Sequence, residues 1–306
     1  MDPNSIYYRQ VALLVRVLPW LEETPCFALK GGTAINLFVR DMPRLSIDID
    51  LAYLPIEARE DSLRHIHAAL LRLAKTLEQK IPGCSVQSVL LKGEGIAHKL
   101  LISQAGVQIK VEVTPVLRGT VYPPEVHSVM PSVENEFGFA EAQLVSLADL
   151  YGGKICAALD RQHPRDLFDA MLLLDNEGVC REVFNAFLVY LISHNRPMSE
   201  LLAPHEIDIA DAFTHHFDGM TRDPISLDAL VKSRRRLISE VRNQFTKADK
   251  AFLLSVKRGE PDWSLIDLPR VRELPAVQWK LRNLAAMPAD RHRDAIDRLE
   301  RVLEGL

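Results

Sequence analysis

Apolar residues along this chain follow two spacings, and each spacing predicts one kind of element. In the first half, short segments that alternate polar with apolar residues or run apolar predict strands. These are Cys26 to Leu29, Leu45 to Leu54, Ser85 to Leu91, His98 to Ser103 and Val107 to Thr114. Apolar residues at steps of three and four predict helices over Ile6 to Leu18, Thr33 to Val39 and Glu57 to Lys80. Ala105-Gly106 predicts a hairpin between the last two strands.

The second half of the chain carries only helical patterns. They predict helices over Leu144 to Leu159, Pro164 to Leu174, Glu182 to Ile192, Ser226 to Val256 and Arg291 to Leu303. Pro197 to Pro224 shows no regular pattern. We therefore expect an α/β (mixed) N-terminal domain over residues 1–135, with a mixed sheet flanked by helices, and an all-helical C-terminal domain over residues 136–306. The boundary falls within Val116 to Glu141, which holds three prolines.

Composition narrows the class of protein without identifying it. The chain has 306 residues, of which 47% are hydrophobic, so two domains with real cores are expected. A net charge of -4 excludes a polycation, and any nucleic acid must meet a local basic patch. The four cysteines have no CxxC spacing, and no segment reads as a signal peptide or as the roughly 18 apolar residues of a membrane span. We expect a cytoplasmic protein with no membrane contact.

The strand over Leu45 to Leu54 carries the strongest chemical signal. Residues two apart share a face of a strand, so Ser46, Asp48 and Asp50 lie together, opposite an apolar face. Two carboxylates about 7 Å apart repel each other and resist burial, and a divalent cation relieves both effects. Magnesium prefers such oxygen ligands. The alternative is a solvated polar face, as edge strands often have.

A glycine turn precedes this strand. Gly31, Gly32 and Thr33 lie between a predicted strand and a predicted helix, where backbone N–H groups can meet a phosphate. Arg44 continues the polar face of the aspartate strand toward this turn. A phosphate cradle followed by a pair of metal-binding carboxylates is the minimum equipment for nucleotidyl transfer.

Glu112 is a candidate third carboxylate. It shares a strand face with Lys110, so it can complete a metal site or accept the proton of an attacking hydroxyl. The alternative is an ion pair with Lys110 or Arg44.

A lysine in the second half stands in an otherwise small and apolar helix. Gly152 and Gly153 directly precede Lys154, and glycine in a helix interior costs about 1 kcal/mol relative to alanine, so something approaches the backbone closely there. Lys154 can hold the β- and γ-phosphates of a nucleotide, or it can snorkel at a domain interface. Asp166 begins the next helix, where it either caps that helix or orients Lys154. In the second case Arg161 and Arg165 hold phosphate.

Basic residues also concentrate between Lys232 and Arg258, opposed there by Glu240 and Asp249. They can meet an RNA backbone or an acidic protein, or form an ordinary solvated helix face. The basic residues are Lys232, Arg234, Arg235, Arg236, Arg242, Lys247, Lys250, Lys257 and Arg258.

Three blocks together resemble a known family. LKGGTAINLF, the R-x-S-x-D-x-D-L strand and DLYGGKICAALDRQHPRDLFD are similar, in this order, to the AbiEii/AbiGii toxin family of nucleotidyltransferases, the MenT-like toxins of the polymerase-β-like superfamily. The resemblance covers Phe27 to Asp169. It implies the toxin half of a toxin–antitoxin or phage-defence system with a cognate antitoxin. It further implies an NTP substrate, Mg²⁺ (or Mn²⁺), and an RNA acceptor such as the tRNA 3′ end.

The resemblance also assigns residues. It implies that Gly32 and Thr33 replace the family's phosphate-binding Gly-Ser turn, and that Asp48 and Asp50 hold the metal, with Glu112 at the third-carboxylate position. Lys154 and Asp166 match helical motifs needed for toxicity, and Ser46 matches a serine that is phosphorylated in a related toxin–antitoxin system. Two other readings stay open. One is a nucleotidyltransferase that modifies a protein or small molecule, and the other is a binding module without catalysis.

Overall fold

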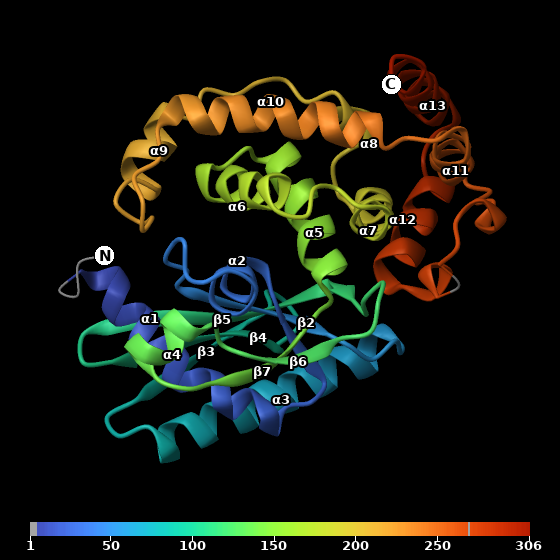
Figure 1. Ribbon diagram of the computed structural model, residues 1–306. Coiled ribbons are helices and arrows are strands. Elements are labelled where there is room, and N and C mark those ends of the chain that lie inside the picture. The colour runs from blue at the N-terminus through green and yellow to red at the C-terminus, as the bar shows by residue number, and fades with distance from the viewer. Residues whose placement is uncertain (1–4, 269) are drawn as a thin grey trace. The chain divides into compact units, whose positions relative to one another are not determined.

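The computed structural model describes residues 5–268 and 270–306, and these residues form two compact units (Figure 1). The first unit holds the described residues up to Ser146 together with Gly219–Pro224. The second unit holds Leu147–Asp218 and Ile225–Leu306. The first unit is a mixed α/β domain and the second is helical, so the predicted fold class is confirmed.

A mixed sheet forms the centre of the first unit. Its described strands lie in the order β3-β4-β5-β2-β1-β7-β6. Only the β2–β5 and β1–β7 pairs are parallel, and the others are antiparallel. The bounds are β1 (Phe27–Lys30), β2 (Asp48–Tyr53), β3 (Ser85–Leu90), β4 (Ala97–Gln104), β5 (Val107–Arg118), β6 (Glu125–Ser128) and β7 (Glu141–Leu144).

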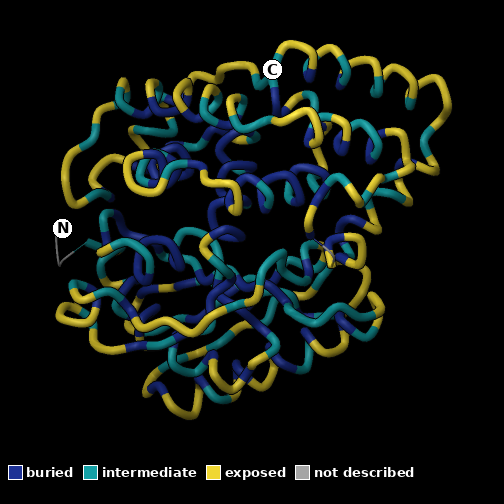
Figure 2. The backbone as a smooth tube through the Cα atoms, turned by 45° about the vertical axis from the view of Figure 1, so that its right-hand side comes forward, coloured by how far each residue is buried: buried dark blue, intermediate teal, exposed yellow. Residues whose placement is uncertain are grey.

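The two faces of this sheet differ in chemistry. Ile49, Leu51, Val111 and Val113 are fully buried, and α1 and α3 pack against the sheet (Figure 1). The buried segments drawn in Figure 2 include these strands. The opposite face carries charged residues, so the alternation read from the sequence separates core from site. The helices of this unit are α1 (Ile6–Val17), a 3-10 segment (Leu18–Glu23), α2 (Gly31–Ala34), a π-helical continuation (Ile35–Val39), α3 (Arg59–Lys80) and α4 (Pro131–Phe137).

The second unit is built around the contact between α5 and α7. A Cβ atom on Gly152 would lie 2.7 Å from the backbone nitrogen of Phe187 and 2.8 Å from Cβ of Ala186, so only glycine lets these helices pack this closely. The predicted close approach to the backbone is therefore confirmed, and its partner is α7. The helices are α5 (Leu147–Asp160), α6 (Pro164–Asp175), α7 (Arg181–Ser193), α8 (Met198–Leu202), α9 (Ala210–His216), α10 (Leu227–Asn243), α11 (Lys247–Arg258), α12 (Pro275–Ala285) and α13 (Ala289–Glu304), with 3-10 turns at Trp263–Leu265 and Val271–Glu273.

Some elements differ from the sequence prediction. The single helix expected over Ser226 to Val256 is wrong, because the chain breaks between α10 and α11. The hydroxyl of Thr246 accepts from the backbone N–H of Asp249, and the Asp249 carboxylate accepts from that of Thr246. This capping box starts a new helix. The segment Pro197 to Pro224, expected to be irregular, contains α8 and α9, and β6, β7, α4 and α12 were not predicted.

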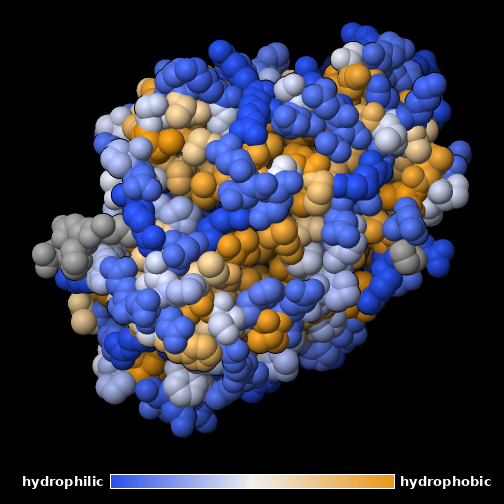
Figure 3. Space-filling model, viewed as in Figure 1, coloured by the Kyte–Doolittle hydropathy of each residue, from blue (hydrophilic) through white to orange (hydrophobic). Residues whose placement is uncertain are grey.

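Polar and apolar side chains both reach the part of the surface drawn in Figure 3. Figure 3 shows hydrophilic side chains over most of one face, with apolar side chains gathered in smaller patches between them. No helix within the described residues is long and apolar enough to cross a membrane.

Candidate active site

Four charged residues form a row across neighbouring strands of the first unit. The strand register places Lys30 of β1 opposite Asp50 of β2, Asp50 opposite Glu112 of β5, and Glu112 opposite Lys99 of β4. Directly paired residues share a face of a sheet, so all four side chains leave the same face. Since β2 lies between β1 and β5, the interpretation of the aspartates as an edge-strand feature is wrong.

Lysines accompany the carboxylates of this row. Lys110 Nζ lies 3.1 Å from a Glu112 oxygen and 3.9 Å from an Asp48 oxygen. Lys99 Nζ lies 3.4 Å from the same Glu112 oxygen. The structure thus shows the ion-pair alternative for Glu112, with Lys99 as an additional partner. Among residues 5–268 and 270–306, no group of three or more acidic, histidine or cysteine side chains is arranged to hold a metal ion.

The electrostatics of the row follow from partial burial and close pairing. Burial lowers the pKa of Lys30, although Asp50 and Glu112 oppose that shift. Burial acts against the charged form of Lys110 too, but Asp48 and Glu112 raise its pKa overall. Glu112 shows the converse, because its lysine partners lower its pKa despite burial. Close pairing therefore favours the charged forms of Lys110 and Glu112, whereas burial disfavours the charged form of Lys30.

The glycine turn lies directly against this row. Gly31 has a φ of +75°, and a Cβ atom there would lie 2.7 Å from Oδ2 of Asp50. A Cβ atom on Gly32 would lie 2.7 Å from Nη2 of Arg44 and 3.0 Å from Oγ of Ser46. The backbone of the turn thus approaches both the carboxylate and the polar residues before it, as only glycine permits.

Thr33 connects the turn to the aspartate strand from inside. Its side chain is fully buried, and its hydroxyl donates to the carbonyl oxygen of Asp48 and lies 3.0 Å from Oγ of Ser46. Ser46 is itself buried. The Thr33 hydroxyl is therefore a positioning group here, and an anion at this turn would meet backbone N–H groups instead.

Arg44 is fixed beside the turn by a segment from far along the chain. The residue is 3% exposed, and its Nη1 donates to the carbonyl oxygen of Leu45. Arg44 forms a β-bridge with Thr221, and the backbone N–H of Leu45 donates to the carbonyl oxygen of Met220. This pairing explains why Gly219–Pro224 belongs to the first unit.

A second charged cluster lies in the second unit, where α5 meets α6. Lys154 Nζ lies 2.8 Å from Asp166 Oδ1 and 3.0 Å from Asp169 Oδ2, and all three side chains are at least 93% buried. Asp169 was not predicted as a site residue. Its spacing of three from Asp166 on a helix was the available signal, because such residues share a face.

Arg161 completes this cluster. Its Nε and Nη2 atoms contact the two oxygens of Asp166 at 2.5 and 3.1 Å. Lys154 and Arg161 hold the pKa of Asp166 well below its usual range, although burial opposes this shift. His163 is the N-cap of α6, because it accepts from the backbone N–H of Arg165, while Asp166 lies in the first turn of that helix, where a carboxylate suits the helix dipole. Asp166 also fixes the orientation of Lys154.

The basic stretch of α10 and α11 is largely neutralised. Arg234 and Arg235 pair with Glu206, and Arg236 pairs with Asp175. Lys232 pairs with Asp228, Arg258 pairs with Glu300, and Lys257 is buried. These acidic partners all lie outside the segment from Lys232 to Arg258 in the sequence. The local excess of positive charge is therefore smaller than the sequence of that segment indicated.

The chain is similar to known proteins in sequence and in fold. Residues 12–283 match the family described as the nucleotidyl transferase AbiEii toxin of type IV toxin–antitoxin systems. The structure is similar to MenT4, a nucleotidyltransferase toxin from Mycobacterium tuberculosis H37Rv, with a TM-score of 0.62 at 15% identity over 91% of this chain and 93% of that one. A protein from H. pylori with a provisional nucleotidyltransferase assignment gives a TM-score of 0.45 at 14% identity over 78% and 95% of the two chains. No curated protein sequence matches significantly.

Proposed function

Because the chain belongs to the AbiEii nucleotidyltransferase toxin family, we propose that it transfers a nucleotide from an NTP to an RNA acceptor, the tRNA 3′ end. In this proposal it acts in the cytoplasm as the toxin of a toxin–antitoxin pair that serves phage defence. The observation that carries the proposal is the backbone of Gly31 against the Asp50 carboxylate. A phosphate on the turn and a metal on the aspartates would then be neighbours.

The residues present fit a divalent cation. Asp48 and Asp50 project from one strand face beside the glycine turn, and the Asp48 side chain is 36% exposed. Mg²⁺ or Mn²⁺ would be held by these two carboxylates, since magnesium often uses only one or two protein oxygens and takes others from substrate phosphates. Such an ion neutralises triphosphate charge and aligns the attacking oxygen. Glu112 would join this site as a third ligand, or as the base, after release from Lys110.

The remaining residues position substrate groups in this proposal. The N–H groups of Gly31, Gly32 and Thr33 would bind the triphosphate, with Arg44 and Ser46 holding the turn. Lys154 would stabilise the pyrophosphate leaving group. Asp166 and Asp169 hold that lysine in one orientation. Arg161 would keep Asp166 charged, and Arg165 would add positive charge beside it.

One labelling experiment tests the proposal. Purified protein is incubated with total tRNA, magnesium and each of the four α-labelled NTPs, with Asp48→Ala as the control. We expect label in RNA with the wild type alone, because the variant lacks one of the two proposed metal ligands. RNA labelling equal in wild type and Asp48→Ala would refute the metal assignment. The absence of any label would favour a binding module without catalysis.

A second candidate is transfer to a protein or small-molecule acceptor. The observation that favours it is the pairing of Arg234, Arg235 and Arg236 with carboxylates, which leaves less positive charge for an RNA backbone. Label on protein in the same assay, and none on RNA, would establish this candidate instead.

A further inference from the structure

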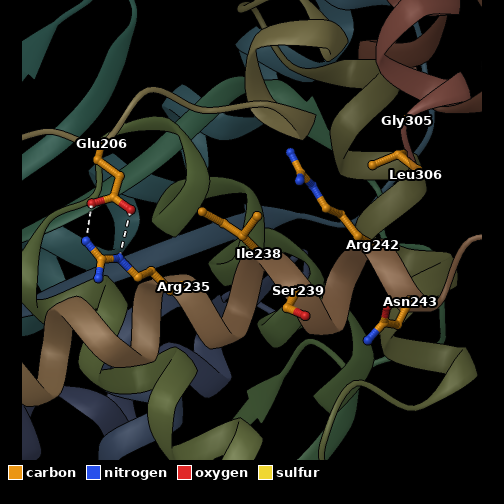
Figure 4. A pocket seen from close by; sticks show the side chains of 8 residues that line it. All are labelled: Glu206, Arg235, Ile238, Ser239, Arg242, Asn243, Gly305 and Leu306. Carbon is orange, nitrogen blue, oxygen red and sulfur yellow. Dashed lines mark hydrogen bonds and ion pairs between the residues drawn. The ribbon is translucent and has the colours of Figure 1, made fainter.

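A polar pocket of about 380 Å³ lies along α10 and shares no lining residue with either charged cluster described above. Five residues of α10 line it, at steps of one, three and four, so they belong to one helix face. They are Arg235, Ile238, Ser239, Arg242 and Asn243 (Figure 4). Glu206 and residues 305–306 complete the wall, and all of these residues lie in the second unit. The volume falls within the range of small-molecule sites.

Arg242 is the cation of this pocket that has no carboxylate partner within residues 5–268 and 270–306. Its Nη2 donates to the carbonyl oxygen of Leu202 at 3.2 Å, while its buried Nε has no hydrogen-bond partner among the described residues. Figure 4 shows its side chain rising from α10 and pointing back along the helix toward Ile238. A buried charged donor left unpaired is costly. An anion bound beside the guanidinium would supply its missing counter-charge.

Arg235 is a second cation that an anion can recruit. It pairs with Glu206 at 2.9 and 3.1 Å, but the two side chains are 64% and 43% exposed. Exposed ion pairs contribute little to stability, so a ligand can replace Glu206 at small cost. Glu206 would keep its contact with the buried Arg234, at 2.8 Å.

The rest of the lining defines the chemical class of the ligand. Ser239 and Asn243 are exposed and offer a hydroxyl and an amide, while Ile238 offers an apolar contact. Arginine forks match the oxygens of phosphate and carboxylate groups. We propose that this pocket binds a small molecule that bears a phosphate or carboxylate group, held by Arg242 and Arg235. This proposal does not depend on the proposed transfer activity.

Titration calorimetry tests this site with inorganic phosphate, pyrophosphate and citrate as separate probes. We expect at least one probe to bind the wild type, and Arg242→Gln to weaken that binding at least tenfold. Ser239→Glu places a carboxylate in the pocket at an exposed helical position, so it should abolish binding without unfolding the protein. Binding of the phosphates alone, or of citrate alone, would support the proposal and identify the group recognised.

Lys247→Gln is the matched control, because Lys247 is an exposed cation at the start of α11 outside the pocket. It should bind the probe like the wild type, and circular dichroism should show that every variant is folded. Equal affinity in the wild type and Ser239→Glu would place the bound anion elsewhere and overturn the proposal. The absence of binding by all three probes would overturn it too.

Discussion

The carboxylate of Asp50 occupies the space that a side chain on Gly31 would need, since a Cβ atom there would lie 2.7 Å from Asp50 Oδ2. The turn and the aspartate strand are thereby set at contact distance. The positive φ of Gly31 independently disfavours any other residue.

Gly31→Ala should therefore lower nucleotidyl transfer far more than it lowers stability. We expect a loss of roughly 1–3 kcal/mol from the backbone conformation, and at least about a hundredfold loss of activity, since small displacements of catalytic groups cost this much. Urea denaturation and the labelling assay measure the two effects. Gly83→Ala is the matched control, because Gly83 has a φ of +70° and no atom within 4 Å of its Cβ position. A similar loss of activity in Gly83→Ala would show that the effect of Gly31→Ala does not depend on the contact with Asp50.

Asp169→Asn should destabilise the protein markedly, although no sequence argument selected Asp169. Its carboxylate is fully buried against Lys154, and breaking a buried ion pair typically costs about 3–5 kcal/mol. The same substitution at Asp175, on the same helix, removes an exposed partner of Arg236 and should cost less than about 1 kcal/mol. Chemical denaturation of the two variants compares them directly, and equal losses would show that burial of the cluster contributes nothing.

Stability should also depend on pH through His163. Burial and the nearby Arg165 lower the pKa of His163 to about 4, below its unfolded value of about 6.5. The folded state then binds fewer protons than the unfolded state between these values, so stability is complete above about pH 6.5 and falls as the pH drops toward 4. His163→Asn keeps a capping side chain without titrating. The variant should lose stability less steeply between pH 6.5 and 4, and an unchanged slope would contradict this assignment.

The strands of the first unit could be predicted from the sequence better than the contacts between the residues of its candidate site. The alternation around Asp48 and Asp50 gave their face correctly, because strand periodicity is local. The Lys110–Glu112 pair was available from spacing on one strand, but the contact of Lys99 with Glu112 depends on the register of β4 and β5, which no local pattern specifies. The bridge between Arg44 and Thr221 joins segments far apart in the chain, so it could not be predicted. The break before α11 was missed because the capping box at Thr246 was read as helix interior.

Substitution of Thr33 tests whether its hydroxyl positions the aspartate strand or contacts the phosphate of the NTP directly. Its buried hydroxyl donates to the carbonyl oxygen of Asp48, so Thr33→Val leaves that acceptor without this partner. The cost should be roughly 1–3 kcal/mol, and nucleotidyl transfer should fall with it as the aspartate strand shifts. Thr33→Ser keeps the hydroxyl and should restore most of both. If Thr33→Val instead kept full stability and only raised KM for the NTP, the hydroxyl would be a phosphate ligand, and the positioning role would be wrong.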